Sequence, residues 1–284
     1  MPEWLFFTLF AAMLWGVGQI FVKKGLGDIS PLLNNIFGSV VIFIVSMSYS
    51  LLNGVNYALL PKVFPLALAA SFLILIYYYA ISKGQVSLTG TILSMYPLVT
   101  IVLSLYFLHE QPSIAQKLAI IFVLLGTFIL ALGENAKKLR NLKIDSWFWW
   151  GIIGAFLIGI SDFLAKVGTN QTDLYTYVFA YGLAFPLVSA ISFVFDKKGR
   201  KLPEFSINNF LPTVLGVSMV ESGLIVYYIA ISKGLVSVVT PISSVYVGIT
   251  VILALIFLKE KIKGLQIFGI ILSFIGIILL GLVV

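Results

Sequence analysis

The chain contains one stretch twice: YYYAISKGQVS at Tyr77–Ser87 and YYIAISKGLVS at Tyr227–Ser237. Nine of the eleven positions are identical at an offset of 150 residues, an agreement that chance does not readily produce. The same offset relates FLHE at residues 107–110 to FLKE at 257–260, and Gly126 to Gly276. Nearer the start of each half, an offset of 143 relates Gly16, Lys23 and Gly25 to Gly159, Lys166 and Gly168. The sequence therefore indicates an internal duplication.

The composition indicates that the duplicated unit lies in a membrane. Of 284 residues, 60% are hydrophobic and 10% are charged, whereas a soluble domain has about 25% charged residues. The mean hydropathy of +1.09 leaves too little polar surface to cover a water-exposed globule. Continuous apolar runs predict helices, which satisfy their own backbone groups in lipid. We expect ten spans, at residues 3–22, 33–52, 62–82, 87–108, 113–133, 147–167, 174–195, 209–231, 236–258 and 262–283.

The fold prediction is an all-α membrane protein of ten transmembrane helices, in two inverted five-helix repeats. We expect the first repeat at residues 1–135, a basic connecting loop at 136–146 and the second repeat at 147–284. Because each repeat has an odd number of spans, the second must enter the membrane from the opposite side. Many secondary transporters use this arrangement around a site at the midplane.

The net charge of +7 follows from topology rather than from nucleic-acid binding. Most of the basic residues lie in connections between spans, above all Glu134–Ser146 and Asp196–Asn208. Four of the 18 Lys and Arg residues lie on the side of the N-terminus and fourteen on the other side. The positive-inside rule then predicts that both termini are outside the cell.

The two halves resemble tandem EamA repeats of the drug/metabolite transporter superfamily. The resemblance rests on WGVGQIFVKKG at Trp15–Gly25, the two AISKG stretches, FLHE and FLKE, and the glycines of the fifth helices. It implies a cavity lined by helices 1, 3, 4, 6, 8 and 9, and export of amino acids, related metabolites or drugs without ATP. It also implies termini inside the cell. Here it disagrees with the charge count, so the orientation stays open.

Two acidic residues lie inside expected spans and away from the span ends, where ionisable groups are costly and are candidates for function. Glu221 lies near the middle of the eighth span, and burial disfavours its charged form. It could carry a proton or pair with a cationic substrate, or it could be permanently protonated in a structural hydrogen bond. Asp162, in the sixth span, could share this site, or Lys166 one turn further on could simply neutralise it.

A set of aromatic, amide and hydroxyl residues shares the expected cavity faces and could stack an amphipathic ligand and donate hydrogen bonds to it. These substrate-cavity candidates are Trp15, Gln19, Tyr78, Ser94, Tyr96, Ser218, Ser222, Tyr228, Thr240, Ser243 and Tyr246. Pro97 and Pro241 are expected to interrupt the fourth and ninth helices. Asn34 and Asn35 are expected to cap the second helix rather than to bind a ligand.

The sequence carries no sign of a cofactor, a metal site or catalysis. There are no cysteines and one histidine, and no P-loop or glycine-rich nucleotide turn is present. We therefore expect a monomeric secondary transporter in a prokaryotic cytoplasmic membrane. It would export a small amphipathic, amino-acid-like metabolite by alternating access, driven by protons. The alternative is an uncoupled facilitator, or a flippase for a lipid-linked metabolite, on the same fold.

Overall fold

The computed structural model describes residues 1–25, 29–82, 92–139, 146–201, 207–258 and 264–282. The first half contains α1 (Glu3–Gly25), α2 (Pro31–Asn53), the 3-10 turn η1 (Tyr57–Leu59), α3 (Leu60–Ile74), α4 (Ile76–Ser82), α6 (Tyr96–Phe107) and α7 (Ile114–Leu139). The second half contains α8 (Ser146–Gln171), α9 (Leu174–Phe195), α10 (Ile207–Lys233), α11 (Val236–Ser243), α12 (Tyr246–Leu258) and α13 (Gly264–Leu282).

These elements form the ten expected transmembrane helices. The third span is made by α3 and α4 together, the ninth by α11 and α12, and the fourth contains α6. Within the described residues, six helical segments are long and apolar enough to cross a membrane, and four shorter apolar helices accompany them. The all-α prediction is confirmed, and the chain is an integral multi-pass membrane protein.

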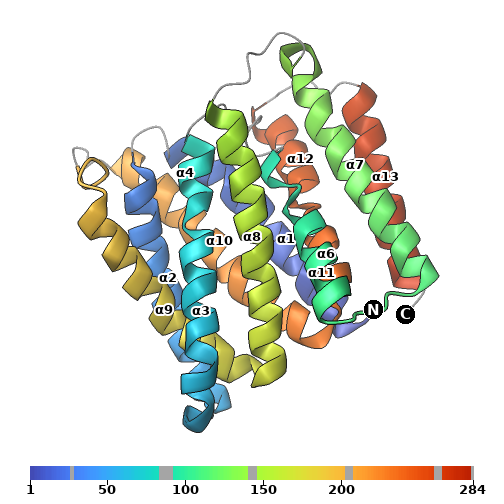
Figure 1. Cartoon of the computed structure of the whole chain (residues 1–284). Helices are drawn as coiled ribbons and strands as arrows, with labels where there is room; N and C mark the ends of the chain where they lie inside the picture. The colour runs from blue at the N-terminus through green and yellow to red at the C-terminus, as the bar shows by residue number, and fades with distance from the viewer. Residues whose placement is uncertain (26–28, 83–91, 140–145, 202–206, 259–263, 283–284) are drawn as a thin grey trace.

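The helix contacts repeat between the two halves as a pseudo-two-fold axis requires, and the helices can be followed in Figure 1. Helix α1 packs against α10, and its repeat partner α8 packs against α3, the partner of α10. Likewise, α6 contacts α8 where α12 contacts α1. The remaining partners, α2 with α9 and α7 with α13, pair with each other across the axis. The two halves are therefore inverted copies, as the odd number of spans in each repeat predicts.

Two glycines related by the offset of 143 allow two of these helix pairs, α1 with α12 and α8 with α6, to pack closely. A Cβ atom added to Gly16 would lie 2.7 Å from the Ile249 side chain, and one added to Gly159 would lie 2.6 Å from Val99. The Thr250 hydroxyl donates to the Gly16 carbonyl at 3.1 Å, and the Thr100 hydroxyl donates to the Gly159 carbonyl at 3.1 Å. Small residues allow backbones to approach in lipid, where no hydrophobic drive brings helices together.

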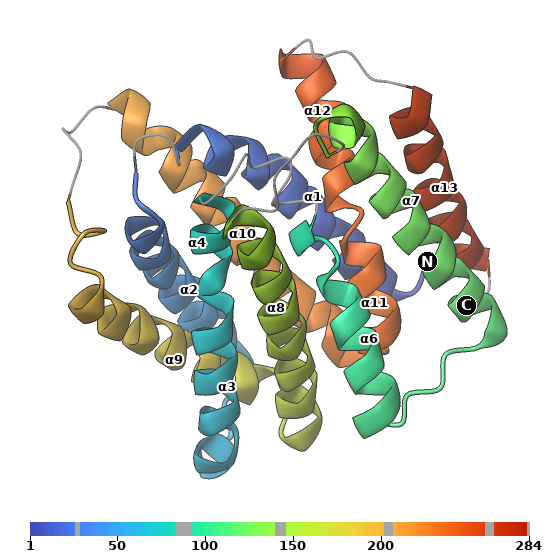
Figure 2. The same cartoon turned by 45° about the horizontal axis from the view of Figure 1, so that its top comes forward.

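Glycines also allow α7 and α13 to pack closely together. A Cβ on Gly126 would lie 2.5 Å from the Ser273 backbone nitrogen, and one on Gly276 would lie 3.0 Å from that of Val123. The pair stands beside the rest of the bundle in Figures 1 and 2. The centre of the bundle is surrounded by the other helices, with α7 and α13 outside it.

Both ends of the chain lie at the same end of the bundle, which we call the terminal face (Figures 1 and 2). An even number of spans requires this placement. Helices α2 and α9 have corresponding N-caps: the Ser30 hydroxyl accepts from the Leu33 N–H at 3.2 Å, and the Asp173 carboxylate accepts from Thr176 at 2.8 Å. The expectation that Asn34 and Asn35 cap α2 was therefore wrong, because Ser30 does so.

The ninth span is interrupted at Ser244–Val245, and the described part of the fourth has a break at Ser94–Met95. These positions are 150 residues apart, whereas Pro97 and Pro241 are not repeat partners. Pro97 lies in the first turn of α6 and Pro241 lies inside α11. The Ser244 hydroxyl donates to the Pro241 carbonyl at 2.6 Å, so a serine satisfies a carbonyl that the helix break leaves without a backbone N–H. The breaks belong to the repeat rather than to either proline.

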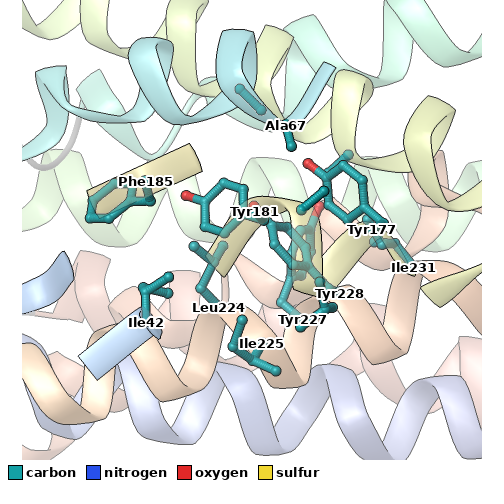
Figure 3. Packing of buried hydrophobic residues seen from close by; sticks show 14 of the residues in the cluster. Ile42, Ala67, Tyr177, Tyr181, Phe185, Leu224, Ile225, Tyr227, Tyr228 and Ile231 are labelled. Carbon is teal, nitrogen blue, oxygen red and sulfur yellow. The ribbon is translucent and has the colours of Figure 1, made fainter. Parts of the chain in front are cut away.

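The largest buried cluster among the described residues packs α9 and α10 together with neighbouring helices, including Ile42 of α2 and Ala67 of α3 (Figure 3). Tyr177 and Tyr181 of α9 each meet Tyr228 of α10 edge to face, with ring centroids 5.3 and 5.2 Å apart. The hydroxyls of Tyr177 and Tyr181 are buried without a hydrogen-bond partner among the described residues. This cluster fixes α10 against α9 and so places the face of α10 that carries Glu221.

Candidate functional site

A cavity of about 80 Å³ lies at the centre of the bundle, between the two repeats. Its lining comes from both halves: Trp15, Gln19, Asn35, Ile74, Tyr77, Tyr78, Leu93, Tyr96, Ile158, Asp162, Phe185, Val220, Glu221, Leu224 and Tyr246. Tyr96 and Tyr246 are repeat partners and the first residues of α6 and α12, directly after the helix breaks. Transporters commonly build midplane sites at interrupted helices.

Glu221 reaches the cavity from α10 and is 5% exposed. The Tyr78 hydroxyl of α4 donates to Glu221 Oε1 at 3.1 Å, so the two repeats meet at this bond. Gly38 of α2 makes room for the carboxyl group, because an added Cβ would lie 2.8 Å from Oε1. In the described structure no salt bridge reaches Glu221, so its charged form has only a hydroxyl partner.

Asp162 reaches the same cavity from α8 and is 4% exposed. The Tyr227 hydroxyl lies 3.0 Å from Asp162 Oδ2 and 2.6 Å from the Thr240 hydroxyl of α11. The ion pair considered for Asp162 and Lys166 is not formed. Instead, Lys166 Nζ donates to the carbonyls of Ile231 and Gly234 at the end of α10. Cationic groups favour this position because a helix exposes free carbonyls at its C-terminus.

Aromatic rings form much of the remaining wall. The Trp15 ring meets Tyr246 edge to face at 6.0 Å and lies 5.4 Å from Tyr227. Its indole N–H donates to the Val220 carbonyl at 3.0 Å, which fixes the ring plane. The Tyr77 hydroxyl, by contrast, is buried without a partner among the described residues. It is a free hydrogen-bonding group in the wall of the cavity.

Seven of the residues singled out from the sequence line this cavity: Trp15, Gln19, Tyr78, Tyr96, Asp162, Glu221 and Tyr246. Thr240 and Ser243 lie behind the lining, where they hydrogen-bond to Tyr227 and Tyr96. Tyr228 lies in the tyrosine cluster of α9 and α10. Ser94 is buried outside the lining, and Ser218 and Ser222 are half-buried outside it.

Sequence reasoning missed Asn35 and Tyr77 as lining residues. Asn35 was assigned to a cap, yet it is buried and its amide donates to the Leu75 carbonyl at 3.2 Å, at the break between α3 and α4. Tyr77 begins the repeated YYYAISKG stretch and is the repeat partner of Tyr227. The repeat could therefore have identified Tyr77 as a candidate lining residue. The apolar lining residues had no signal in the sequence.

The charged groups in the described lining of the cavity are all acidic. Its lining carries two carboxyl groups and no Lys, Arg or His side chain among the described residues. An enclosed site of this kind favours bound protons or cations, because a lone carboxylate loses hydration that only a counter-charge or a proton replaces. The described residues also contain no group of three or more His, Cys, Asp or Glu that could hold a metal ion.

The EamA-like transporter family matches the chain twice, at residues 2–132 and 145–282. The chain belongs to this family. It is therefore a membrane transporter of the drug/metabolite transporter superfamily, as its sequence motifs indicated. Each match covers one five-helix half of this EamA transporter.

One relative by sequence and one by structure are similar to this chain. MJ1333.1, an uncharacterized protein of Methanocaldococcus jannaschii, is 30% identical over 134 residues, which are 46% of this chain and 93% of that protein. The aligned length is close to one repeat. A crystal structure of a protein with 16% identity has a TM-score of 0.79 and covers 98% of this chain and 96% of its own. At this identity the likeness shows that the whole EamA fold is shared.

Proposed function

We propose that this EamA protein is a monomeric, proton-coupled exporter in a prokaryotic cytoplasmic membrane. Its substrate would be a small amphipathic metabolite with an amino group, such as an amino acid. Protons and substrate would load the same cavity in turn, at Glu221 and Asp162. The observation that carries the proposal is that these two carboxyl groups share one buried cavity without a basic partner among the described lining.

The pair of acids supports exchange of a proton for a cationic group. A carboxylate held away from water is stabilised by a bound proton or by an ammonium group, and one excludes the other. Tyr78 and Tyr227 each offer one hydroxyl to these acids and so orient them without neutralising them. A loaded site can therefore be discharged by proton entry.

The other walls support an amphipathic solute. The faces of Trp15, Tyr96 and Tyr246 offer stacking and cation–π contact. Gln19 and the unpartnered Tyr77 hydroxyl offer hydrogen bonds to a carboxylate or a hydroxyl of the solute. An amino acid would bind with its ammonium group near Glu221 and Asp162 and with its carboxylate near Gln19 and the Tyr77 hydroxyl.

The inverted repeats support alternating access. Two copies of one unit, related by a pseudo-two-fold axis, can exchange conformations and so open the midplane site to each face in turn. The helix breaks at Ser94–Met95 and Ser244–Val245 give the fourth and ninth spans matching points to bend.

Transport into proteoliposomes tests the proposal. Radiolabelled L-amino acids and small primary amines would be offered one at a time, with and without a pH gradient across the membrane. We expect one class of these solutes to accumulate only when protons move in the opposite direction, and Glu221→Gln to abolish that dependence. Glu3→Gln, an acid that is 74% exposed at the terminal face, is the matched control. Uptake of the same solute at equal rates with and without the gradient would identify an uncoupled facilitator.

A further inference from the structure

The connection between α10 and α11, at residues 234–235, and the first two residues of α11 are held from two sides at the terminal face. These residues end the repeated stretch Tyr227–Ser237. The two side chains that hold them, Glu110 and Lys166, belong to two other repeated motifs. The proposed transport chemistry does not use any of them. Their contacts give them a role in closing the cavity.

Glu110 holds the connection from the first repeat. Its Oε1 accepts from the Val236 N–H at 2.9 Å, and its Oε2 accepts from the Ser237 N–H at 2.9 Å and the Ser237 hydroxyl at 2.6 Å. A carboxylate at a helix N-terminus satisfies free N–H groups and the positive end of the helix dipole. His109, in the left-handed conformation with φ of 52°, turns the chain after α6 so that Glu110 meets α11.

Lys166 holds the connection from α8 in the second repeat. Its ammonium group donates to the Ile231 carbonyl at 2.5 Å and to the Gly234 carbonyl at 2.9 Å. It is 8% exposed, so these carbonyls replace most of its hydration. Glu110 and Lys166 thus fix the start of α11 and the end of α10, and we call the two side chains with residues 234–237 the latch.

The latch separates two hollows in the protein. On its outer side lies a vestibule of about 360 Å³, whose lining is Trp4, Gln116, Lys166, Ser232, Lys233, Gly234, Leu235 and Val238. On its inner side lies the cavity with Asp162, and the two linings share no residue. Asp162 and Lys166 are one turn apart on α8, a rise of about 6 Å. The barrier along α8 is therefore about one helical turn thick.

Helix α11 connects the latch to Asp162 in the cavity. Each of its residues is buried, and Figure 2 shows it beside α6 near the chain termini. Its Thr240 hydroxyl lies 2.6 Å from that of Tyr227, which in turn contacts Asp162. Its Ser243 hydroxyl lies 3.1 Å from that of Tyr96 in the cavity wall. A shift of α11 thus changes the hydrogen bonds of the latch and of Asp162 together.

We propose that Glu110 and Lys166 are positioning residues that close the cavity at the terminal face, and that Asp162 controls this closure through Tyr227, Thr240 and α11. Breaking either contact with the connection frees α11 and joins the vestibule to the cavity. The part that concerns Asp162 rests on the proposed transport function, whereas closure itself does not. The offset of 150 gives Glu110 a repeat partner in Glu260, which lies outside the described residues.

Thiol labelling tests the latch without a substrate, because the chain contains no cysteine. Leu224→Cys places one thiol in the cavity wall. A membrane-impermeant maleimide would be added to the terminal face of oriented vesicles, and the labelling rate measured. We expect Glu110→Gln and Lys166→Met to raise the rate about tenfold, and Glu110→Asp to restore most of the closure. Glu3→Gln, at the same face with its salt bridge to Lys233, should leave the rate unchanged.

Two results would overturn parts of the inference separately. If Glu110→Gln elutes and melts as a folded protein but labels at the parental rate, the latch does not close the cavity. Tyr227→Phe should raise the rate about threefold with the latch residues intact, since it removes the hydroxyl between Asp162 and Thr240. An unchanged rate in Tyr227→Phe would refute the link to Asp162 and leave closure by Glu110 and Lys166 standing. A failure of the transport proposal would appear in proteoliposomes and not in these rates.

Discussion

The two halves of the molecule are built alike but charged differently. Asp162 of the second half corresponds to Gln19 of the first, and Glu221 corresponds to Ser71. Ser71 is fully buried and its hydroxyl has no partner among the described residues. The glycine crossings, threonine bonds and helix breaks, in contrast, occur in both halves. Symmetry thus determines the packing, whereas the proposed proton chemistry depends on positions where the symmetry is broken.

The largest effect should come from removing Glu221 and Asp162, the two carboxyl groups that have no acidic counterpart in the other half. We expect Glu221→Gln and Asp162→Asn each to lower the initial rate of proton-driven transport about 100-fold, or about 2.7 kcal/mol in the barrier. A neutral amide cannot release a proton and attracts an amine weakly. Ser71→Ala, at the partner position, should stay within about twofold of the parent. Rates in proteoliposomes measure both, and equal losses at Ser71 and Glu221 would remove the distinction between the halves.

Moving one charge across the pseudo-two-fold axis sharpens the comparison. Gln19 lines the same cavity as Asp162, and the first half offers the unpartnered Tyr77 hydroxyl where the second has Tyr227. Gln19→Asp in the Asp162→Asn background should therefore recover the rate to within about tenfold of the parent. No recovery, in a variant that folds, would mean that the position of the acid matters as much as its presence in the cavity.

The matched glycines should show the next largest effect, on stability. An alanine at Gly159 would meet the Val99 side chain at 2.6 Å and the Tyr96 carbonyl at 2.7 Å. At Gly16 the carbonyl of Tyr246 is further away, at 3.1 Å. Overpacking costs about 1–3 kcal/mol, so we expect Gly159→Ala to lose more than Gly16→Ala. The free energy of unfolding in mixed micelles checks this order, and the reverse order would contradict the geometry.

The matched threonines should show a smaller effect of equal size in the two halves. Thr100→Val and Thr250→Val each remove one hydroxyl bond to a glycine carbonyl across a helix crossing. Interhelical hydrogen bonds in membranes contribute about 0.6 kcal/mol. We expect each variant to lose about that amount by the same unfolding measurement. A loss above about 2 kcal/mol in one half only would show that the crossings are not equivalent.

The smallest effect should lie outside the membrane, at the ends of α2 and α9. Partial burial opposes ionisation of Asp196, but hydrogen bonds from the Gly199 N–H and the Tyr79 hydroxyl hold its pKa below the ordinary value. A lowered folded-state pKa stabilises the fold above the unfolded pKa, and this stabilisation is lost as the pH falls through the folded value.

Asp196→Asn should therefore lower the thermal midpoint slightly at pH 7, and the difference should shrink as the pH falls through the lowered pKa of Asp196. The partner position holds Asn53, whose amide donates to the Tyr49 carbonyl. Asn53→Ala is the control, and its effect should not depend on pH. A difference for Asp196→Asn that grows as the pH falls would contradict the assigned sign.

The sequence was sufficient for the fold because the signals were long and repeated. Apolar runs set the spans, and the matching AISKG stretches set the inverted repeat. The cavity lining was predictable where a side chain was chemically unusual for its depth, as with Glu221, Asp162 and Gln19. Tyr78, Tyr96 and Tyr246 were found through the repeat.

The remaining features depend on rotation and contact between distant helices. Nothing local in the sequence shows that Lys166 points to the end of α10 rather than to Asp162. Asn35 lies at the start of a helix, where capping is the usual role, and only the packing of α2 against α4 brings it to the cavity. The contact of Glu110 with α11 spans 126 residues and was equally invisible.

Proton release on ligand binding tests the central claim most directly. The purified protein would be mixed in weakly buffered detergent solution with the amine or amino acid that the transport panel identifies, and the pH change recorded. We predict that the wild-type protein releases protons on binding and that the Glu221→Gln, Asp162→Asn double variant releases none. Equal proton release by both proteins, or binding by the wild-type protein without any release, would contradict the account.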